Sequence, residues 1–146
     1  MNKKRLKVAF VCVHNSCRSQ MAEAIARVLA QDVFDAYSAG TDIKKHINED
    51  AVEVIKRLYG VDMRMTQNVK EITDIPAIDI VITMGCNMGC PVLRCQYRED
   101  WGLEDPTGKG MAAFLQTAAV VREKILLLKK RIINGEIDVF RKEEGL

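Results

Sequence analysis

The sequence predicts an α/β fold in which helices cover both faces of an open parallel sheet. Short apolar runs at 7–11, 34–39 and 78–84 alternate with longer segments of helical periodicity. The third run is almost uninterruptedly apolar, which is typical of a strand buried on both faces. With 146 residues, of which 48% are hydrophobic and 29% charged, the chain can fill the core of one domain spanning 1–146.

The first half of the chain supplies two predicted strands and two predicted helices. The strand at 7–11 precedes a helix at 19–31, whose apolar residues recur at helical spacing: Met21, Ala22, Ile25, Val28 and Leu29. The strand at 34–39 precedes a second helix, which Asn48 caps and Gly60 ends. This second helix places four apolar residues on one face: Ala51, Val52, Ile55 and Leu58.

The second half begins with a short predicted helix at 70–75 and continues with the strand at 78–84. A loop with several glycines and cysteines, "GCNMGCPVLRC", follows at 85–95. A weak strand is expected at 96–98. A long helix is predicted at 111–133, where it meets the stop signal "NG".

Composition excludes several classes of protein. A net charge of +2 is too small to indicate nucleic-acid or membrane-surface binding. The basic start "MNKKRLKVAFVCV" has too short an apolar part and no cleavage site for a signal peptide, so we expect a cytoplasmic protein. An odd number of cysteines argues against a disulfide framework and favours metal binding or thiol chemistry: Cys12, Cys17, Cys86, Cys90 and Cys95.

The stretch "VAFVCVHNSCRSQMAEA" places Cys12 at the end of the first strand and a helix start just after Arg18. Ligands of open α/β sheets bind at the carboxyl ends of the strands. The amides of a loop entering a helix can surround an oxyanion, and an arginine adds a fork of donors. The same positive field favours a thiolate. The spacing therefore predicts a site that binds an oxyanion and attacks its central atom with sulfur.

Neighbouring residues fit this interpretation. Ser19 is placed to donate a hydrogen bond to the Cys12 sulfur, and Asn15 tolerates the left-handed conformation that a tight loop needs. Cys17 is expected to pack rather than react. The alternative is a buried cysteine beside a surface arginine with no shared function.

"CVHNSCRSQMAEA" resembles the phosphate-binding loop of the low-molecular-weight protein tyrosine phosphatases and of the arsenate reductases built on the same fold. "YSAGT" at 37–41, "VITM" at 81–84 and "DP" at 105–106 follow in the family's order, so the resemblance covers nearly the whole chain. It implies a three-layer, flavodoxin-like open sheet of about four parallel strands. It also implies an oxyanion bound by one continuous segment: Val13, His14, Asn15, Ser16, Cys17, Arg18 and Ser19.

The resemblance makes Asp105 the general acid that protonates the departing oxygen. Read without it, "EDPTG" is an ordinary turn, and Glu104 is a competing carboxylate. Phosphatases of this type usually carry aromatic residues just after Asp-Pro. Here "DPTGKG" has none, and Trp101 lies before the aspartate. This departure favours a reductase over a phosphatase.

"MGC…CP" resembles the redox segment of thioredoxin-coupled arsenate reductases. Cys86 and Cys90 match its second and third redox cysteines. The implied reaction reduces arsenate to arsenite through disulfides that pass from Cys12 to Cys86 to Cys90, and thioredoxin regenerates the enzyme. The spacing is shorter than in the best-known examples, and Cys95 competes for the terminal role.

The resemblance also implies partners and one candidate cofactor. Arsenate is the expected substrate, with phosphate or sulfate as mimics, and thioredoxin is the expected protein partner of a monomer that binds neither nucleic acid nor membrane. No tightly bound cofactor is expected. Potassium is a candidate because Asn15, Glu23 and Ser38 match positions of a monovalent-cation site.

Three other interpretations stay open. One is a tyrosine-type phosphatase whose extra cysteines protect it from oxidation. Another is a non-enzymatic thiol or metal sensor, although neither a nucleic-acid-binding face nor a dimer signal is visible. The third is a structural zinc site, in which Cys86, Cys90 and Cys95 would need a fourth ligand from elsewhere.

Overall fold

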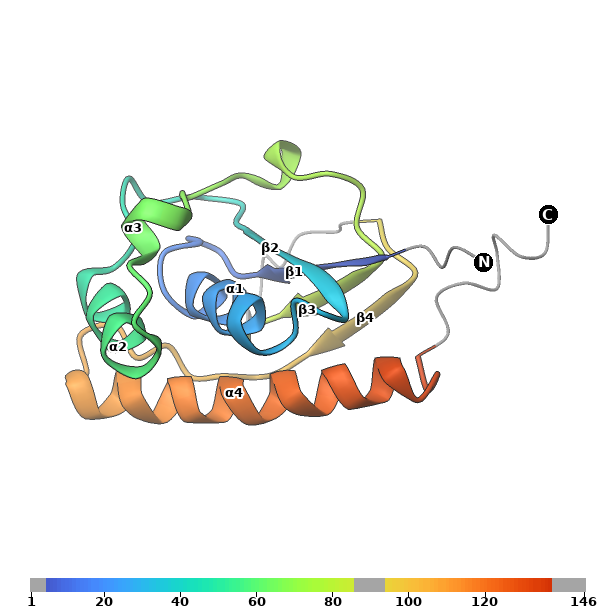
Figure 1. Cartoon of the computed structure of the whole chain (residues 1–146). Coiled ribbons are helices and arrows are strands. Elements are labelled where there is room, and N and C mark those ends of the chain that lie inside the picture. The colour runs from blue at the N-terminus through green and yellow to red at the C-terminus, as the bar shows by residue number, and fades with distance from the viewer. Residues whose placement is uncertain (1–4, 86–93, 138–146) are drawn as a thin grey trace.

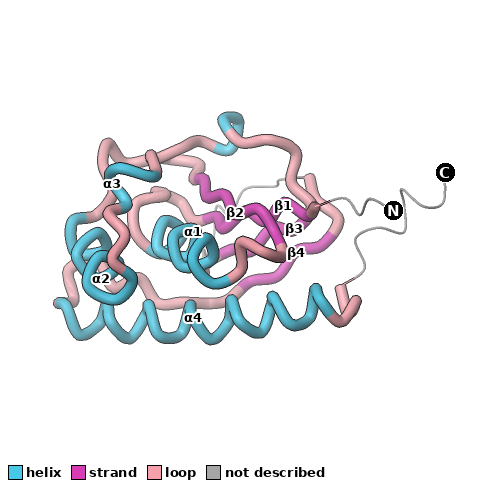
Figure 2. Tube along the Cα trace, viewed as in Figure 1, coloured by secondary structure: helices cyan, strands magenta, loops and turns pink. Residues whose placement is uncertain are grey.

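The computed structural model of the chain describes residues 5–85 and 94–137. Its strands are distributed along the chain among the helices, and β3 and β4 are consecutive in the described part (Figures 1 and 2). In order the elements are β1 (Leu6–Val11), α1 (Arg18–Leu29), β2 (Phe34–Ala39), α2 (Glu49–Tyr59), α3 (Met63–Thr66), the 3-10 helix η1 (Ile72–Asp74), β3 (Ile80–Thr83), β4 (Tyr97–Asp100) and α4 (Met111–Ile133).

The four strands form one open parallel sheet in the order β2-β1-β3-β4. Val11 is level with Ala39 on one side and Thr83 on the other, and Thr83 is level with Asp100. The carboxyl ends of all four strands therefore meet at one edge. This arrangement confirms the predicted α/β fold class and places Cys12, the residue after β1, at that edge.

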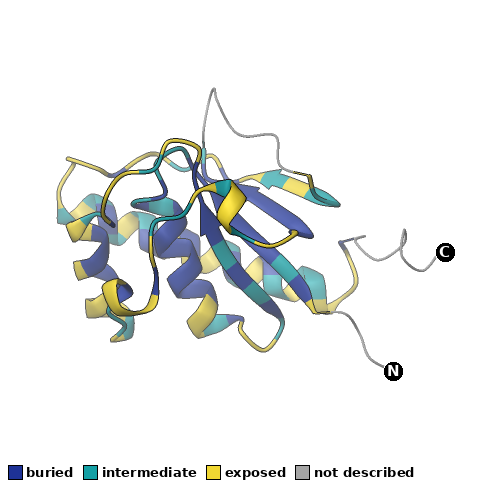
Figure 3. Cartoon of the chain, turned by 90° about the horizontal axis from the view of Figure 1, so that it is seen from above, coloured by how far each residue is buried: buried dark blue, intermediate teal, exposed yellow. Residues whose placement is uncertain are grey.

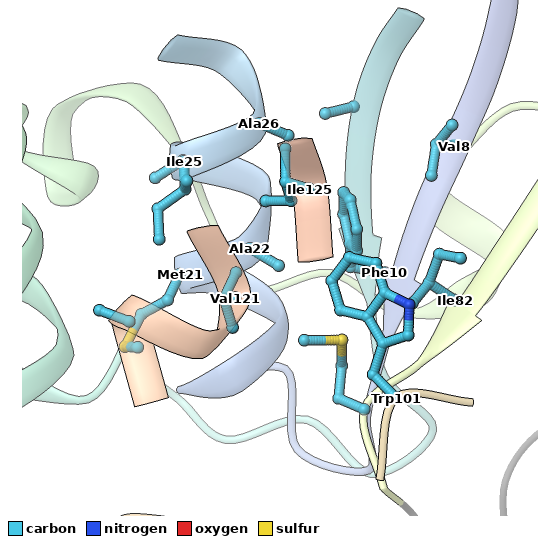
Figure 4. Packing of buried hydrophobic residues seen from close by; sticks show 14 of the residues in the cluster. Val8, Phe10, Met21, Ala22, Ile25, Ala26, Ile82, Trp101, Val121 and Ile125 are labelled. Carbon is cyan, nitrogen blue, oxygen red and sulfur yellow. The ribbon is translucent and has the colours of Figure 1, made fainter. Parts of the chain in front are cut away.

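One face of the sheet carries the main core. Helices α1, α2 and α4 pack there against one another, and α1 also contacts β1 and β2. Figure 4 shows Phe10 and Ile82 of the sheet facing Val121 and Ile125 of α4, and the Trp101 ring lies 5.6 Å from that of Phe10. Full burial of such a side chain stabilises the fold by about 1.5–3 kcal/mol. This core fixes the position of the α1 start relative to the end of β1.

The other face of the sheet is covered by the segment around η1. Ala9, Val11 and Val81 are fully buried there, and Ile72 and Ile75 pack on them. In Figure 3 this segment, drawn partly in yellow for exposed residues, runs over the dark blue buried strands. The sheet thus lies between a layer of α-helices and a thinner layer that contains the 3-10 helix.

The predicted caps of α2 are confirmed. The Asn48 side chain accepts hydrogen bonds from the amides of Asp50 and Ala51 at 2.8 and 3.1 Å. Gly60 ends the helix with a φ of 72°, a conformation that suits glycine. The cap matters for the site because it fixes Asn48, which lines the cavity described below.

Predicted bounds hold for β2, α2 and α4, and the other predicted elements shift by a few residues or shorten. The helix α3 was not predicted, and the short helix at 70–75 is a 3-10 helix. Val28 and Leu58 were placed on buried faces, but they are 46% and 47% exposed. Both lie near the ends of their helices. In α1 the consecutive residues 19–26 are all buried, because α2, α4 and the sheet surround this part of the helix. In the parts that the structure describes, no helix is long and apolar enough to span a membrane.

Candidate active site

Cys12 lies at the carboxyl edge of the sheet with 4% of its surface exposed. Its Sγ atom is 2.9 Å from the Ser19 hydroxyl, which also accepts a hydrogen bond from the Asn15 amide at 2.9 Å. Because Asn15 occupies the acceptor side of that hydroxyl, the Ser19 proton is free to point at sulfur. The Ser19 hydroxyl is therefore placed to donate to the Cys12 sulfur, as the sequence predicted.

The Asn15 side chain hydrogen-bonds residues on and next to the loop and so fixes its shape. It is the one non-glycine residue with positive φ, 51°, in the described ranges, as its predicted role requires. Its buried Oδ1 accepts hydrogen bonds from the Lys70 amide at 2.7 Å and the Gln20 side chain at 2.9 Å. The Asn15 backbone amide stays a predicted oxyanion-binding group. The side chain faces Ser19, Gln20 and Lys70, and these contacts position the loop.

Gly40, in the "YSAGT" turn, approaches the loop so closely that no side chain fits there. A Cβ atom on Gly40 would lie 2.5 Å from the Val13 carbonyl oxygen and 2.9 Å from that of Cys12. The amides of Thr41 and Asp42 donate to the same Val13 oxygen at 3.0 and 2.9 Å. This turn therefore fixes the start of the loop.

In front of Cys12 lies a cavity of about 340 Å³. Four residues of the predicted loop line it together with Cys12, and Val13, Asn15 and Ser19 do not. Four further lining residues were not predicted: Lys44, His46, Asn48 and Thr107. The complete lining is Cys12, His14, Ser16, Cys17, Arg18, Lys44, His46, Asn48, Asp105 and Thr107. The basic run "KKH" at 44–46 was the available signal, and it adds positive charge where an anion would bind.

Arg18 connects three parts of the site. One guanidinium nitrogen donates to the carbonyl oxygens of Met84 at 2.8 Å and Leu103 at 2.7 Å. The other terminal nitrogen lies 4.0 Å from an Asp105 carboxylate oxygen. The planar fork is thus fixed at the cavity wall, with the end of β3 on one side and the loop carrying Asp105 on the other.

Asp105 lines the cavity, whereas Glu104 does not. Glu104 has an 82% exposed side chain and pairs with Lys109 at 2.7 Å. Burial by itself would raise the pKa of the Asp105 carboxyl. Hydrogen bonds from the Thr107 hydroxyl and amide, at 2.7 and 3.0 Å, and the charges of Arg18 and His14 outweigh that effect and hold the pKa below its usual value. In the free protein this carboxylate is therefore charged at neutral pH.

Cys17 also lines the cavity, and burial changes the pKa of its thiol. Burial, supported by the negative charge of Asp105, raises the pKa of the Cys17 thiol to about 12. Only 4% of the residue is exposed. At neutral pH Cys17 is therefore a neutral thiol, in agreement with its predicted packing role.

Two of the predicted redox cysteines, Cys86 and Cys90, lie outside the described residues. The residues that lead to them are fixed at the site: Met84 O accepts from Arg18, and the Gly85 amide donates to an Asp100 carboxylate oxygen at 2.9 Å. Cys86 follows Gly85 directly in the sequence. Gly85, the residue before Cys86, is therefore held next to the cavity wall that Arg18 forms.

Cys95 lies near the other end of the sheet. It precedes β4 and packs against the cluster of Ala9, Val11 and Val81, on the face away from the main core. Tyr97 of β4 is level with Val8 of β1, and Cys95 lies two residues before Tyr97. At about 3.3 Å per residue, Cys95 and Cys12 are therefore roughly 15–20 Å apart along the strand direction. Within 5–85 and 94–137, no three metal-ligating side chains gather in one place.

Trp101 belongs to the core rather than to the cavity. It is 7% exposed, and its indole nitrogen donates to Glu99 at 2.7 Å. In the described ranges no Phe, Tyr or Trp side chain lines the cavity, and its rings are the imidazoles of His14 and His46. A phenol would find no Phe, Tyr or Trp ring to stack on there.

The family model for low molecular weight phosphotyrosine protein phosphatases matches residues 7–136 of the chain. The chain belongs to this family. Within it, an arsenate reductase of Staphylococcus xylosus is 36% identical over 134 residues, which cover 87% of this chain and 94% of the relative. Arsenate reductase 1 of Staphylococcus epidermidis is 34% identical over 130 residues, covering 86% and 96%.

Solved structures agree with this family membership. An arsenate reductase in the phosphate binding state superposes with a TM-score of 0.77 at 32% identity, covering 87% of this chain and 98% of the other. A thioredoxin-dependent arsenate reductase of Corynebacterium glutamicum gives a TM-score of 0.74 at 30% identity, covering 92% and 65%. The family match confirms the predicted resemblance, and the solved structures agree with the predicted open parallel sheet.

Proposed function

We propose that this protein reduces arsenate to arsenite. The observation that carries the proposal is the cavity in front of Cys12, which combines a hydrogen-bonded sulfur, the Arg18 guanidinium and the Asp105 carboxylate, with no Phe, Tyr or Trp among its described lining residues. A tetrahedral oxyanion fits its volume and positive lining. The similarity to arsenate reductases in both sequence and fold supports the same substrate.

In the first step the Cys12 thiolate forms a bond to arsenic, and one arsenate oxygen leaves as water. Asp105 supplies the proton. It is charged in the free protein, but a bound oxyanion places like charge beside it, which raises a carboxyl pKa. The carboxyl therefore takes up its proton as the substrate binds. Arg18 and the loop amides hold the remaining oxygens.

In the second step the Cys86 thiolate attacks the Cys12 sulfur. A disulfide forms, the sulfur–arsenic bond breaks, and arsenic keeps the electron pair and leaves as arsenite. Cys90 then attacks Cys86, releases the Cys12 thiolate and leaves a Cys86–Cys90 disulfide. Cys90 is preferred to Cys95 because Cys95 packs near the far end of the sheet. A dithiol protein of the thioredoxin class returns the two electrons.

A coupled assay with thioredoxin, thioredoxin reductase and NADPH tests the proposal. Arsenate should cause sustained NADPH oxidation, and hydrolysis of p-nitrophenyl phosphate should be slow by comparison. Phosphate-ester hydrolysis without arsenate-dependent oxidation would instead make the protein a phosphatase.

Two matched variants test the cascade. Cys90→Ser should release about one arsenite per enzyme and then stop, because the Cys12–Cys86 disulfide has no resolving thiol. Cys95→Ser, the control, should turn over as the wild type does. Normal turnover of Cys90→Ser with loss in Cys95→Ser would reverse the assignment.

A further inference from the structure

The starting observation is a buried carboxylate behind the phosphate-binding loop. Glu23 lies on α1 with 1% of its surface exposed, where an unpaired charge would be costly. One of its oxygens accepts from the Ser38 hydroxyl and from the Lys70 ammonium, the latter at 3.3 Å. Its other oxygen pairs with Arg27. The charge is therefore balanced by side chains of the protein itself.

Lys70 reaches this carboxylate from a well-fixed backbone. Its amide donates to Asn15 Oδ1 at 2.7 Å, and its carbonyl oxygen accepts from the Gly40 amide at 2.9 Å. Its ammonium also donates to the Asn68 carbonyl oxygen at 2.7 Å and is shielded, with a side chain that is 21% exposed. One residue thus touches both the loop and the buried carboxylate.

The contacts of Lys70 lead directly to the nucleophile. Asn15, which its amide holds, donates to the Ser19 hydroxyl, and that hydroxyl lies 2.9 Å from the Cys12 sulfur. A shift of the Lys70 backbone would remove one of the hydrogen bonds that hold the Asn15 side chain, beside those to Gln20 and Ser19. Lys70 is therefore one of the residues that fix the loop.

These residues do not fit the potassium ion that the sequence suggested. Potassium is held by oxygen atoms that replace its water shell. Here Asn15 Oδ1 already accepts two N–H donors, and the nearest Glu23 oxygen accepts from a hydroxyl and an ammonium. An ion at this carboxylate would have to displace the ammonium of Lys70.

We propose that the Lys70 ammonium is a built-in cation that makes the phosphate-binding loop independent of monovalent cations. It takes the place of an exchangeable ion between Glu23 and the loop. In this role Lys70 is a positioning residue. The proposal goes beyond arsenate reduction and holds whichever reaction the loop performs.

The test compares Lys70→Met with a control, Lys129→Met. The Lys129 ammonium also contacts one carbonyl oxygen and one carboxylate, at 2.9 and 3.1 Å. Its partner carboxylate, Asp32, has a 70% exposed side chain. The melting temperature and the dissociation constant for sulfate are measured in KCl and in tetramethylammonium chloride at equal ionic strength. Tetramethylammonium is too large to replace the lost ammonium.

Wild type should show the same melting temperature and sulfate affinity in both salts. In tetramethylammonium chloride, the melting temperature of Lys70→Met should be at least about 3 °C below that of wild type. In KCl the variant should regain much of that melting temperature and of its sulfate affinity. Lys129→Met should show no potassium-specific recovery, because its partner carboxylate is hydrated.

Two outcomes would overturn the proposal. One is a wild type whose melting temperature or sulfate affinity rises in KCl relative to tetramethylammonium chloride. The other is a folded Lys70→Met that loses stability without potassium-specific recovery. If Lys70→Met does not fold, Lys70→Arg decides the matter: it keeps a cation, so its sulfate affinity should be the same in both salts, and a potassium requirement would refute the proposal.

Discussion

Two walls of the cavity are held in different ways. In the loop at 12–19 half of the residues are buried and the other half are partly buried, and its side chains bond to one another and to residues far along the chain. The loop at 103–110 is largely exposed, with Asp105 fixed by its neighbour Thr107 and by Arg18 at 4.0 Å. The proposed nucleophile is thus positioned by contacts to distant parts of the chain, and the proposed acid by local contacts. Changes on the two walls should therefore differ in kind.

Cys12→Ser should have the largest effect, because it removes the reacting atom from the buried wall. A serine hydroxyl still fits beside Ser19, so the fold and sulfate binding should persist. Arsenate turnover should fall by at least about 10⁴-fold in the coupled assay. Residual turnover near the wild-type level would place the nucleophile on another cysteine.

Asp105→Asn tests the exposed wall. Loss of the general acid should lower turnover by about 10²–10⁴-fold. Sulfate should bind at least as tightly as before, because a negative charge leaves the cavity. Glu104→Gln is the matched control: its side chain points to Lys109, and turnover should stay within about 2-fold of wild type. Equal losses in both variants would contradict the assignment of the acid.

Gly40→Ala sharpens the contrast because it changes the buried wall without touching a reacting group. The new methyl group would displace the Val13 carbonyl, so the free energy of unfolding should fall by about 1–3 kcal/mol in urea titrations, and sulfate should bind more weakly. Gly60→Ala, where a Cβ meets nothing within 4 Å, should cost about 1–2 kcal/mol through its φ of 72°. It should leave sulfate affinity unchanged. Weakened sulfate binding in Gly60→Ala would mean that the loop responds to global stability instead.

Thr107→Val should have the smallest effect and shift a pH profile. The Thr107 hydroxyl stabilises the charged form of Asp105, so its loss should raise the pKa of that carboxyl. A general acid with a raised pKa stays protonated to higher pH. The alkaline limb of kcat/KM should therefore move to higher pH, with a change of only a few-fold at neutrality. A shift to lower pH would contradict the hydrogen bond's direction.

Local signals in the sequence were sufficient for much of the fold and for the nucleophilic loop. Strand and helix periodicity placed Cys12 at the end of a strand and Arg18 at a helix start, and the structure shows both. These features depend on residues that are neighbours in the chain. The predicted cascade through Cys86 and Cys90 stays a prediction, because both lie outside the described residues.

Other features depend on contacts between distant segments, which periodicity does not reveal. Glu23 has the sequence appearance of a solvated helix residue, yet Ser38 and Lys70 bury it from two other segments. Lys44 and His46 reach the cavity through a long connection after β2. Asn15 was predicted to tolerate a left-handed conformation, but its partners, Gln20 and Lys70, could not be predicted from spacing.

The position of Arg18 has a thermodynamic consequence. The same guanidinium that faces the cavity bonds the carbonyl oxygens of Met84 and Leu103, so oxyanion binding and the order of those two segments share one side chain. Linkage is reciprocal: if an oxyanion that fixes Arg18 tightens these segments by some factor, then tightening the segments raises oxyanion affinity by the same factor. Any change that orders or loosens Met84 or Leu103 would then alter how strongly the empty cavity attracts its next anion.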